Sequence, residues 1–255
     1  MSLNKVTIVG ASGNIGAAVL PQLLNSDLDI TILSRLDSSA VFPNGAKVIK
    51  SDYTVDSLTK ALKGQDAVVS MLPIVALSEQ QNVAEAAIRA GVKRFIPSEY
   101  GSDSSGLKLG MTGFDIQNKT VNLIDEGKTR FTTSTVAQIG RSIISVLQHP
   151  AETKNQLVFV ESFTTTQLEI LAALKKLTGE EWKINHGSSE SIKQDGFQKL
   201  GNGELLEGGA AIIMALVLGK DGLEDHTHVK GGIWNERLGL KNESVEDTVK
   251  EVLGL

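Results

Sequence analysis

The chain has 255 residues, no cysteine and a net charge of −5 at pH 7, with 41% apolar and 22% charged residues. This length and apolar content are those of a globular protein with one sizeable core, or of a nucleotide-binding domain with a smaller partner domain. The lack of cysteine excludes disulfide bonds, thiolate catalysis and cysteine-ligated metals. The acidic balance, without a basic stripe, argues against nucleic acid as a partner.

Nothing in the composition predicts attachment to a membrane or secretion. The longest apolar run, 210–218, is too short to span a bilayer and is more typical of a buried helix. No basic-then-apolar leader opens the chain, so we expect a cytoplasmic protein.

The first elements predict a dinucleotide-binding βαβ unit. A β-branched strand at 5–9 leads into a glycine-rich turn, an apolar-periodic helix follows from 17, and a second strand covers 29–33. The turn has the spacing G-x-x-G-x-x-G, and the alternative to phosphate binding is a tight turn without a ligand. The residues predicted to cradle phosphate are Gly10, Ala11, Ser12, Gly13, Asn14, Ile15 and Gly16.

The three glycines of this turn have separate predicted roles. Gly10 permits the tight turn, Gly13 lets the backbone approach a pyrophosphate, and Gly16 lets helix and strand pack closely. The helix that follows presents unpaired N–H groups and the positive end of its dipole to the phosphates.

The end of the second strand predicts which dinucleotide binds. Ser34 and Arg35 offer a hydroxyl and a guanidinium group, which suit a 2′-phosphate and favour NADP(H). Asp37, two residues later, is the alternative, because a carboxylate in this region binds the ribose 2′-OH of NAD.

Alternating strands and helices continue to residue 96 and predict a Rossmann-type, doubly wound parallel sheet. Strands are expected near 48–49, 67–72 and 94–96, and helices at 56–64 and 78–90. Ligands bind beyond the carboxyl ends of such strands. Met71 and Leu72 stand at one of these ends, as cofactor contacts or as core residues.

The pattern changes near residue 106, which predicts a nucleotide-binding domain over 1–106 and a smaller α+β substrate region over 107–255. Two strands are expected around a turn at 125–128, with further strands and capped helices after them. The expected strands are 119–124, 129–135, 156–161 and 182–185, and the helices are 136–148, 170–177, 188–200, 205–218 and 244–253.

The string Gly91-Val92-Lys93-Arg94-Phe95-Ile96-Pro97-Ser98-Glu99-Tyr100-Gly101, with the glycine turn and Arg35, closely resembles the NmrA-like family. The likeness is to its isoflavone reductase-like branch as found in fungi, and 163–174 extends it. This resemblance implies an atypical short-chain-dehydrogenase fold, NADP(H), and hydride transfer to small, often aromatic, molecules. It also implies that Pro97, Ser98 and Glu99 lie near the nicotinamide, so Ser98 joins the predicted cofactor-binding residues.

The chain departs from this family directly after that string. Family members carry there a helix with the lysine usually assigned as catalytic acid/base, and then another strand. The six to ten residues around 103–108 cannot hold both, because a helix and a strand need roughly 20 residues. No catalytic residue is therefore predicted. Lys108 reads as a surface lysine, and Glu99 as either an acid/base or a cap of backbone groups.

Other chemistry is weakly supported. His226-x-His228 has no acidic or sulfur partner at ligand spacing, so no metal site is predicted. Three functions stay open: a reductase of a small molecule, a non-catalytic NADP(H) sensor that binds a protein partner or a second copy, and a shortened gene product that folds poorly. The shortening also predicts that 94–96 lies at a sheet edge.

Overall fold

The computed structural model describes residues 3–73, 76–100 and 112–255, so the shortened stretch at 103–108, with Lys108, lies outside the described residues. The chain divides into two compact units. The first unit comprises Met1–Gly101 with Val136–Leu157, and the second comprises Ser102–Thr135 with Val158–Leu255. Within the described residues, no helix is long and apolar enough to cross a membrane.

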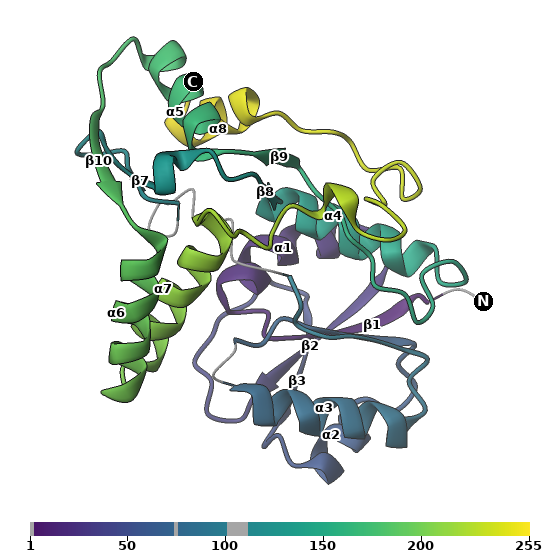
Figure 1. Ribbon diagram of the computed structural model, residues 1–255. Helices are drawn as coiled ribbons and strands as arrows, with labels where there is room; N and C mark the ends of the chain where they lie inside the picture. The colour runs from purple at the N-terminus through teal and green to yellow at the C-terminus, as the bar shows by residue number, and fades with distance from the viewer. Residues whose placement is uncertain (1–2, 74–75, 101–111) are drawn as a thin grey trace. The chain divides into compact units, whose positions relative to one another are not determined.

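The first unit contains a five-stranded parallel sheet in the order β3-β2-β1-β4-β5, the doubly wound arrangement that the sequence predicts (Figure 1). Its strands are β1 (Lys5–Val9), β2 (Asp29–Arg35), β3 (Lys47–Ser51), β4 (Ala67–Ser70) and β5 (Arg94–Ile96). Its helices are α1 (Asn14–Leu24), α2 (Val55–Ala61), α3 (Leu77–Ala90) and α4 (Val136–Gln148). The apolar runs of β1, β2 and β4 are almost wholly buried, as expected for parallel strands covered on both faces.

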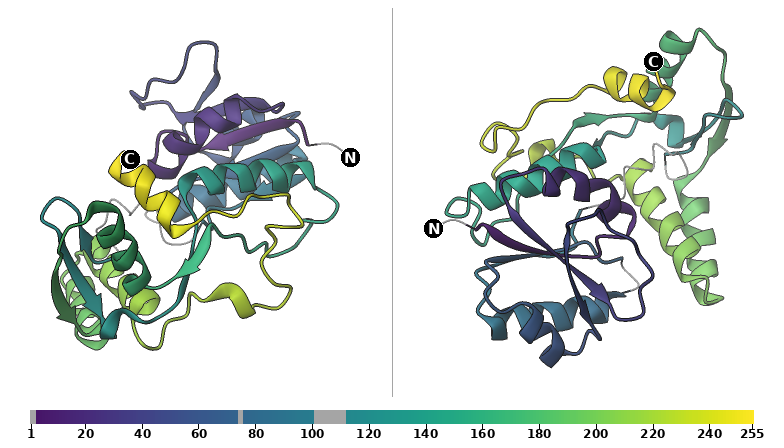
Figure 2. Two further views of the ribbon diagram at one scale, coloured as in Figure 1. Left: turned by 90° about the horizontal axis from the view of Figure 1, so that it is seen from above. Right: turned by 180° about the vertical axis from the view of Figure 1, so that it is seen from behind.

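Helices cover both faces of this sheet. The α1 and α4 helices share a core with β1, β2 and β4 on one face, while α2 and α3 enclose a second core on the other. Figure 2 shows α4 lying alongside α1, where Gly140 leaves room for the side chain of Gln22. The chain thus returns to the first unit after residue 135. The predicted division into 1–106 and 107–255 differs from these units in that segment, because α4 packs beside α1 on the same face of the sheet and completes that core.

Two strands form the edges of this sheet as described, β3 on one side and β5 on the other. The prediction that 94–96 lies at an edge agrees with this order. The side chain of Arg94 is anchored within the first unit, since its guanidinium donates to Thr153 Oγ1 at 2.9 Å and to the Pro150 carbonyl at 2.8 Å.

The second unit is a mixed α+β structure around its own apolar core. One three-stranded sheet has the order β10-β7-β6, and β8 pairs separately with β9. Its strands are β6 (Phe114–Asp115), β7 (Thr120–Ile124), β8 (Phe131–Thr133), β9 (Phe163–Thr165) and β10 (Lys183–Gly187). Its helices are α5 (Gln167–Thr178), α6 (Ser189–Gly201), α7 (Leu205–Leu218) and α8 (Val245–Leu253), with short 3-10 turns η3 (Asp125–Gly127) and η4 (His226–His228).

Several predicted elements of this unit are present, and two expectations are wrong. The predicted caps form: Thr166 and Glu169 make a capping box on α5, and Ser244 caps α8. However, β7 and β8 do not form a hairpin, since each pairs with a strand from later in the chain. The expected strand at 156–161 is absent. Part of its backbone bonds instead to a later loop: both backbone groups of Glu161 bond to the Asn235 side chain, and the Phe159 carbonyl accepts from the Trp234 N–H.

A buried glutamine ties together the backbone of the second unit. Gln167 is 1% exposed, and its amide nitrogen donates to the carbonyls of Thr112 and Asn122 at 2.7 and 2.9 Å. Its amide oxygen accepts from the Ile124 N–H at 2.8 Å. One buried side chain therefore satisfies three backbone groups from separate parts of the second unit.

We expect Gln167→Leu to destabilise the second unit by about 2–4 kcal/mol, because it leaves buried donors and acceptors unpaired. Urea denaturation followed by tryptophan fluorescence measures this, since Trp182 and Trp234 both lie in the second unit. The matched control is Gln194→Leu, at an exposed position on α6, which should change stability by less than about 0.5 kcal/mol. Equal unfolding midpoints for the two variants would contradict the role given to Gln167.

Candidate functional site

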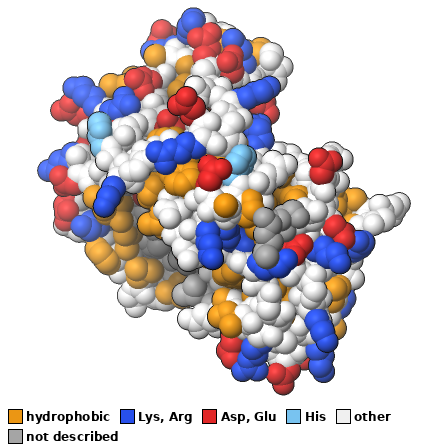
Figure 3. Space-filling view, turned by 90° about the vertical axis from the view of Figure 1, so that its right-hand side faces the viewer, with side chains coloured by type: hydrophobic (Ala, Val, Ile, Leu, Met, Phe, Trp, Pro, Cys, Tyr) orange, Lys and Arg blue, Asp and Glu red, His pale blue; other side chains and the backbone are white. Residues whose placement is uncertain are grey.

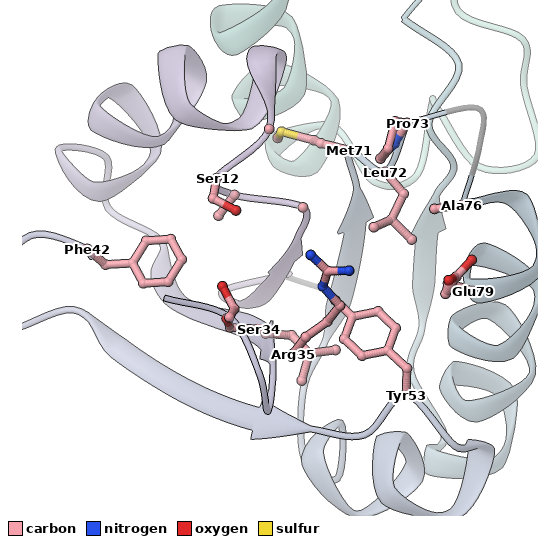
Figure 4. A pocket seen from close by; sticks show the side chains of 15 residues that line it. Ser12, Ser34, Arg35, Phe42, Tyr53, Met71, Leu72, Pro73, Ala76 and Glu79 are labelled. Atoms are coloured by element: carbon pink, nitrogen blue, oxygen red, sulfur yellow. The ribbon is translucent and has the colours of Figure 1, made fainter. Parts of the chain in front are cut away.

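A pocket of about 430 Å³ opens in the first unit beyond the carboxyl ends of β1, β2 and β4. Its size falls within the range of small-molecule sites, and its position is where doubly wound sheets bind ligands. Figure 4 shows side chains entering it from the glycine turn, from the end of β2, from the segment after β4 and from α3. The lining residues are Gly10, Ala11, Ser12, Gly13, Leu33, Ser34, Arg35, Ser38, Phe42, Tyr53, Met71, Leu72, Pro73, Ala76 and Glu79.

The glycine turn that forms one wall has no room for side chains at two of its three glycines. Gly10 has a φ of +85°, and a Cβ there would lie 2.5 Å from the Met71 carbonyl oxygen. A Cβ at Gly16 would lie 2.1 Å from the Gly10 carbonyl oxygen, so α1 approaches the turn as closely as a backbone can. These contacts agree with the predicted roles of Gly10 and Gly16.

Gly13 differs from its two neighbours in the motif. Its φ of −76° is open to any residue, and a Cβ there would meet the Gly10 carbonyl at 3.3 Å and the Met71 carbonyl at 3.7 Å. The folded backbone can take a methyl group at this position with a small adjustment. A glycine is therefore not required here by the backbone, and the space it leaves belongs to the pocket.

The N-terminus of α1 is left open to a ligand. Gly13 is the N-cap of α1 and makes no side-chain capping bond, and the first turn carries no acidic residue. Helix geometry leaves the N–H groups of Asn14, Ile15 and Gly16 without intrahelical partners. The positive end of the helix dipole and these N–H groups suit a phosphate group.

Ser34 and Arg35 lie at the end of β2 on the rim of the pocket. The Arg35 side chain is 68% exposed, and its guanidinium points into the pocket between Ser34 and Tyr53 (Figure 4). Its Nε stands 4.0 Å from the Asp37 carboxylate, at the limit of an ion pair. Asp37 itself does not line the pocket and faces solvent with 83% of its side chain exposed.

Tyr53 and Glu79 line the pocket beside Arg35. Tyr53 follows β3 with a φ of +62°, an unusual conformation for a non-glycine residue, and the Asn82 side chain bonds its carbonyl. Burial raises the pKa of the Tyr53 hydroxyl to about 12, opposed by Arg35 and reinforced by Glu79. The hydroxyl thus stays protonated at neutral pH and can donate or accept a hydrogen bond.

Eight of the twelve predicted cofactor-binding residues line the pocket together. They are Gly10, Ala11, Ser12, Gly13, Ser34, Arg35, Met71 and Leu72. Asn14, Ile15 and Gly16 form the first turn of α1 instead, and Ile15 packs against the core. Ser98 is also outside the lining. Its hydroxyl donates to the Leu72 carbonyl at 2.8 Å and so stabilises the position of a lining residue.

The sequence prediction missed Leu33, Ser38, Phe42, Tyr53, Pro73, Ala76 and Glu79. A signal was available for Tyr53, which stands two residues after the end of β3, at the ligand-binding edge of the parallel sheet. Ser38 and Phe42 belong to the irregular segment after β2, and Glu79 to the first turn of α3, so no periodic pattern marks them.

The described residues offer few groups for acid/base chemistry. Glu99 is exposed and outside the pocket lining, and Tyr100 buries its hydroxyl without a hydrogen-bond partner among the described residues. Burial raises the pKa of the Tyr100 hydroxyl, which makes it a weak acid. No group of three acidic or histidine side chains in the described segments is placed to hold a metal ion.

Comparison with known proteins places these features in a family. Residues 2–116 match the profile of the NmrA-like family. Oxidoreductase poxI of Penicillium oxalicum is 31% identical over 98% of this chain and 94% of its own, and oxidoreductase aprR of Aspergillus flavus is 28% identical over 98% of each. Leucoanthocyanidin reductase of Vitis vinifera, solved with NADPH, superposes with a TM-score of 0.81 at 17% identity, covering 98% of this chain and 99% of the reductase.

The alignments also measure how much shorter this chain is than its relatives. The alignment with poxI spans 300 positions, whereas 98% of 255 residues is about 250, so about 50 positions of poxI lie opposite gaps in this chain. The roughly 20 residues that one helix and one strand need fit well within that total. The glycine turn, the parallel sheet and the match along nearly the whole of poxI agree: this chain belongs to the NmrA-like family.

Proposed function

We propose that this protein is an NADP(H)-dependent oxidoreductase of the isoflavone reductase type, acting in the cytoplasm on a small, aromatic molecule. The observation that carries the proposal is the pocket: an open helix N-terminus beside Gly13, with Arg35 at the opposite rim. The names of poxI, aprR and leucoanthocyanidin reductase support the reaction class. When bound, NADPH would supply the hydride.

The residues present fit the two charged parts of this cofactor. The N–H groups at the start of α1 and the Ser12 hydroxyl suit the pyrophosphate, because that wall presents donors and no carboxylate. Arg35 and Ser34 suit the 2′-phosphate, since both point into the same rim. Met71 and Leu72, held from behind by Ser98, supply an apolar surface at the end of β4.

A second function, non-catalytic sensing of NADP(H), is favoured by one observation. About 50 positions of poxI have no counterpart in this chain, and the resemblance to the family assigns the acid/base lysine to a segment of that kind. A protein without that group still binds the cofactor, and the edge strand β5 could then receive a protein partner or a second copy. A measurement of NADPH oxidation distinguishes the reductase from the non-catalytic sensor.

The first prediction concerns cofactor choice. We expect NADPH to bind more tightly than NADH, and Arg35→Asp to erase or reverse this preference, because an attraction of about 1.5–3 kcal/mol becomes a repulsion. Isothermal titration calorimetry with both nucleotides measures the ratio. The control is Arg89→Ala, on the exposed surface of α3, which should leave the ratio unchanged. Equal affinities in the unmodified protein would defeat the prediction.

The second prediction separates binding from folding at the glycine turn. Gly13→Ala should fold normally and bind NADPH at least about tenfold more weakly, because the methyl group stands where the backbone must approach a phosphate. Gly16→Ala should instead lower the melting temperature, since its Cβ would overlap the Gly10 carbonyl. Gly209→Ala, on α7 with open space around it, is the control: it should leave the NADPH affinity unchanged and should not lower the melting temperature. Unchanged NADPH affinity in Gly13→Ala would show that the turn is no phosphate cradle.

The third prediction concerns turnover. We expect NADPH oxidation with a panel of aromatic and enone substrates to be slow, because a positioned proton donor contributes about 10²–10⁴-fold in rate. The Arg35→Asp variant serves as the background control. Fast turnover would mean that another residue carries the proton, and Glu99→Gln would then be assayed first. Sedimentation of the same sample shows whether β5 has recruited a second copy.

A further inference from the structure

Lys50 brings a second positive charge to the rim of the pocket that no sequence motif marks. In the parallel register of β2 and β3, Lys50 is the partner of Ser34, so both side chains leave the sheet on the same face. The Lys50 ammonium lies 3.3 Å from Ser34 Oγ and 2.9 Å from the Ser38 carbonyl oxygen. Ser34 and Ser38 both line the pocket, which puts this ammonium directly behind two of its wall residues.

These contacts leave one donor of Lys50 and the proton of Ser34 available, although Lys50 itself stands behind the lining residues. An ammonium group has three donors, and the two contacts use two of them. The Ser34 hydroxyl accepts from Lys50, so its own proton is free to be donated; no other partner of Ser34 Oγ occurs in the described part of the chain. Lys50 and Ser34 thus offer two donors to one oxygen-rich group.

The acidic side chains near Arg35 would oppose the binding of a phosphate dianion, so a second cation at this rim would favour it. Arg35 stands near Asp37, whose carboxylate would repel an approaching dianion, with solvent screening both exposed side chains. Lys50 makes no ion pair with any described carboxylate, in contrast to Lys47 on the same strand, which pairs with Asp29. The irregular segment 36–46 contains no lysine or arginine. Lys50 is therefore the second cation near this rim, and it offsets the carboxylates of Asp37 and Glu79.

We propose that Lys50, through its ammonium and the Ser34 hydroxyl that it orients, is a second ligand of the cofactor's 2′-phosphate and a determinant of selectivity for NADP over NAD. The inference rests on the proposed NADP(H) function. Arg35 grips the phosphate from the end of β2, and Lys50 approaches it from β3.

The test compares Lys50→Met, Lys50→Arg and Lys47→Met by calorimetry with NADP⁺, NAD⁺, 2′,5′-ADP and 5′-ADP. Lys50→Met should weaken NADP⁺ and 2′,5′-ADP by about 10- to 100-fold and change NAD⁺ and 5′-ADP by less than about twofold. Lys50→Arg, which keeps the charge, should restore most of the affinity for the 2′-phosphate. Lys47→Met, on the same exposed strand, should bind all four nucleotides as the unmodified protein does.

The outcomes separate this inference from the function on which it rests. Equal weakening of NADP⁺ and NAD⁺ by Lys50→Met would overturn it, because Lys50 would then only hold the Ser38 carbonyl and the wall. Unchanged selectivity would overturn it as well. If the unmodified protein binds neither NADP⁺ nor 2′,5′-ADP, the proposed function itself fails. Circular dichroism of each variant confirms that the fold is intact before affinities are compared.

Discussion

The close approach of α1 to the turn before it is the constraint on which the pocket depends. The Gly10 carbonyl occupies the place where a side chain at residue 16 would begin, so the helix can start only if that residue is glycine. This contact aims the first N–H groups of α1 across the carboxyl ends of the neighbouring strands. If the turn at Gly10–Gly16 were wider, the start of α1 would move away from the strands and this wall of the pocket would be lost.

Selectivity at the opposite rim depends on strand register rather than on one loop. The pairing of Ser34 with Lys50 and of Arg35 with Ser51 fixes which side chains of β3 accompany those of β2. A shift of one residue would turn Lys50 to the other face of the sheet. On the face seen in Figure 3, basic and acidic side chains are interspersed.

The sequence predicts best where a repeated local pattern carries the structure. Alternating strands and helices predicted the parallel sheet. The glycine turn predicted four residues of the pocket, and the carboxyl ends of two strands predicted four more. It failed where pairing depends on residues far along the chain: β7 and β8 resemble a hairpin locally, but β10 and β9 are their actual neighbours. Lys50 was missed for the same reason, because its place beside Ser34 follows from register and not from any motif.

The return of α4 to the first unit has a consequence for synthesis on the ribosome. At about 5–20 residues per second, some 50 residues separate β5 from the end of α4 by several seconds. During that time the face of α1 that packs against Ile139, Ile143 and Leu147 has no cover. The nascent chain therefore exposes this apolar surface until α4 has been synthesised, and a chain that ended before residue 136 would leave it uncovered.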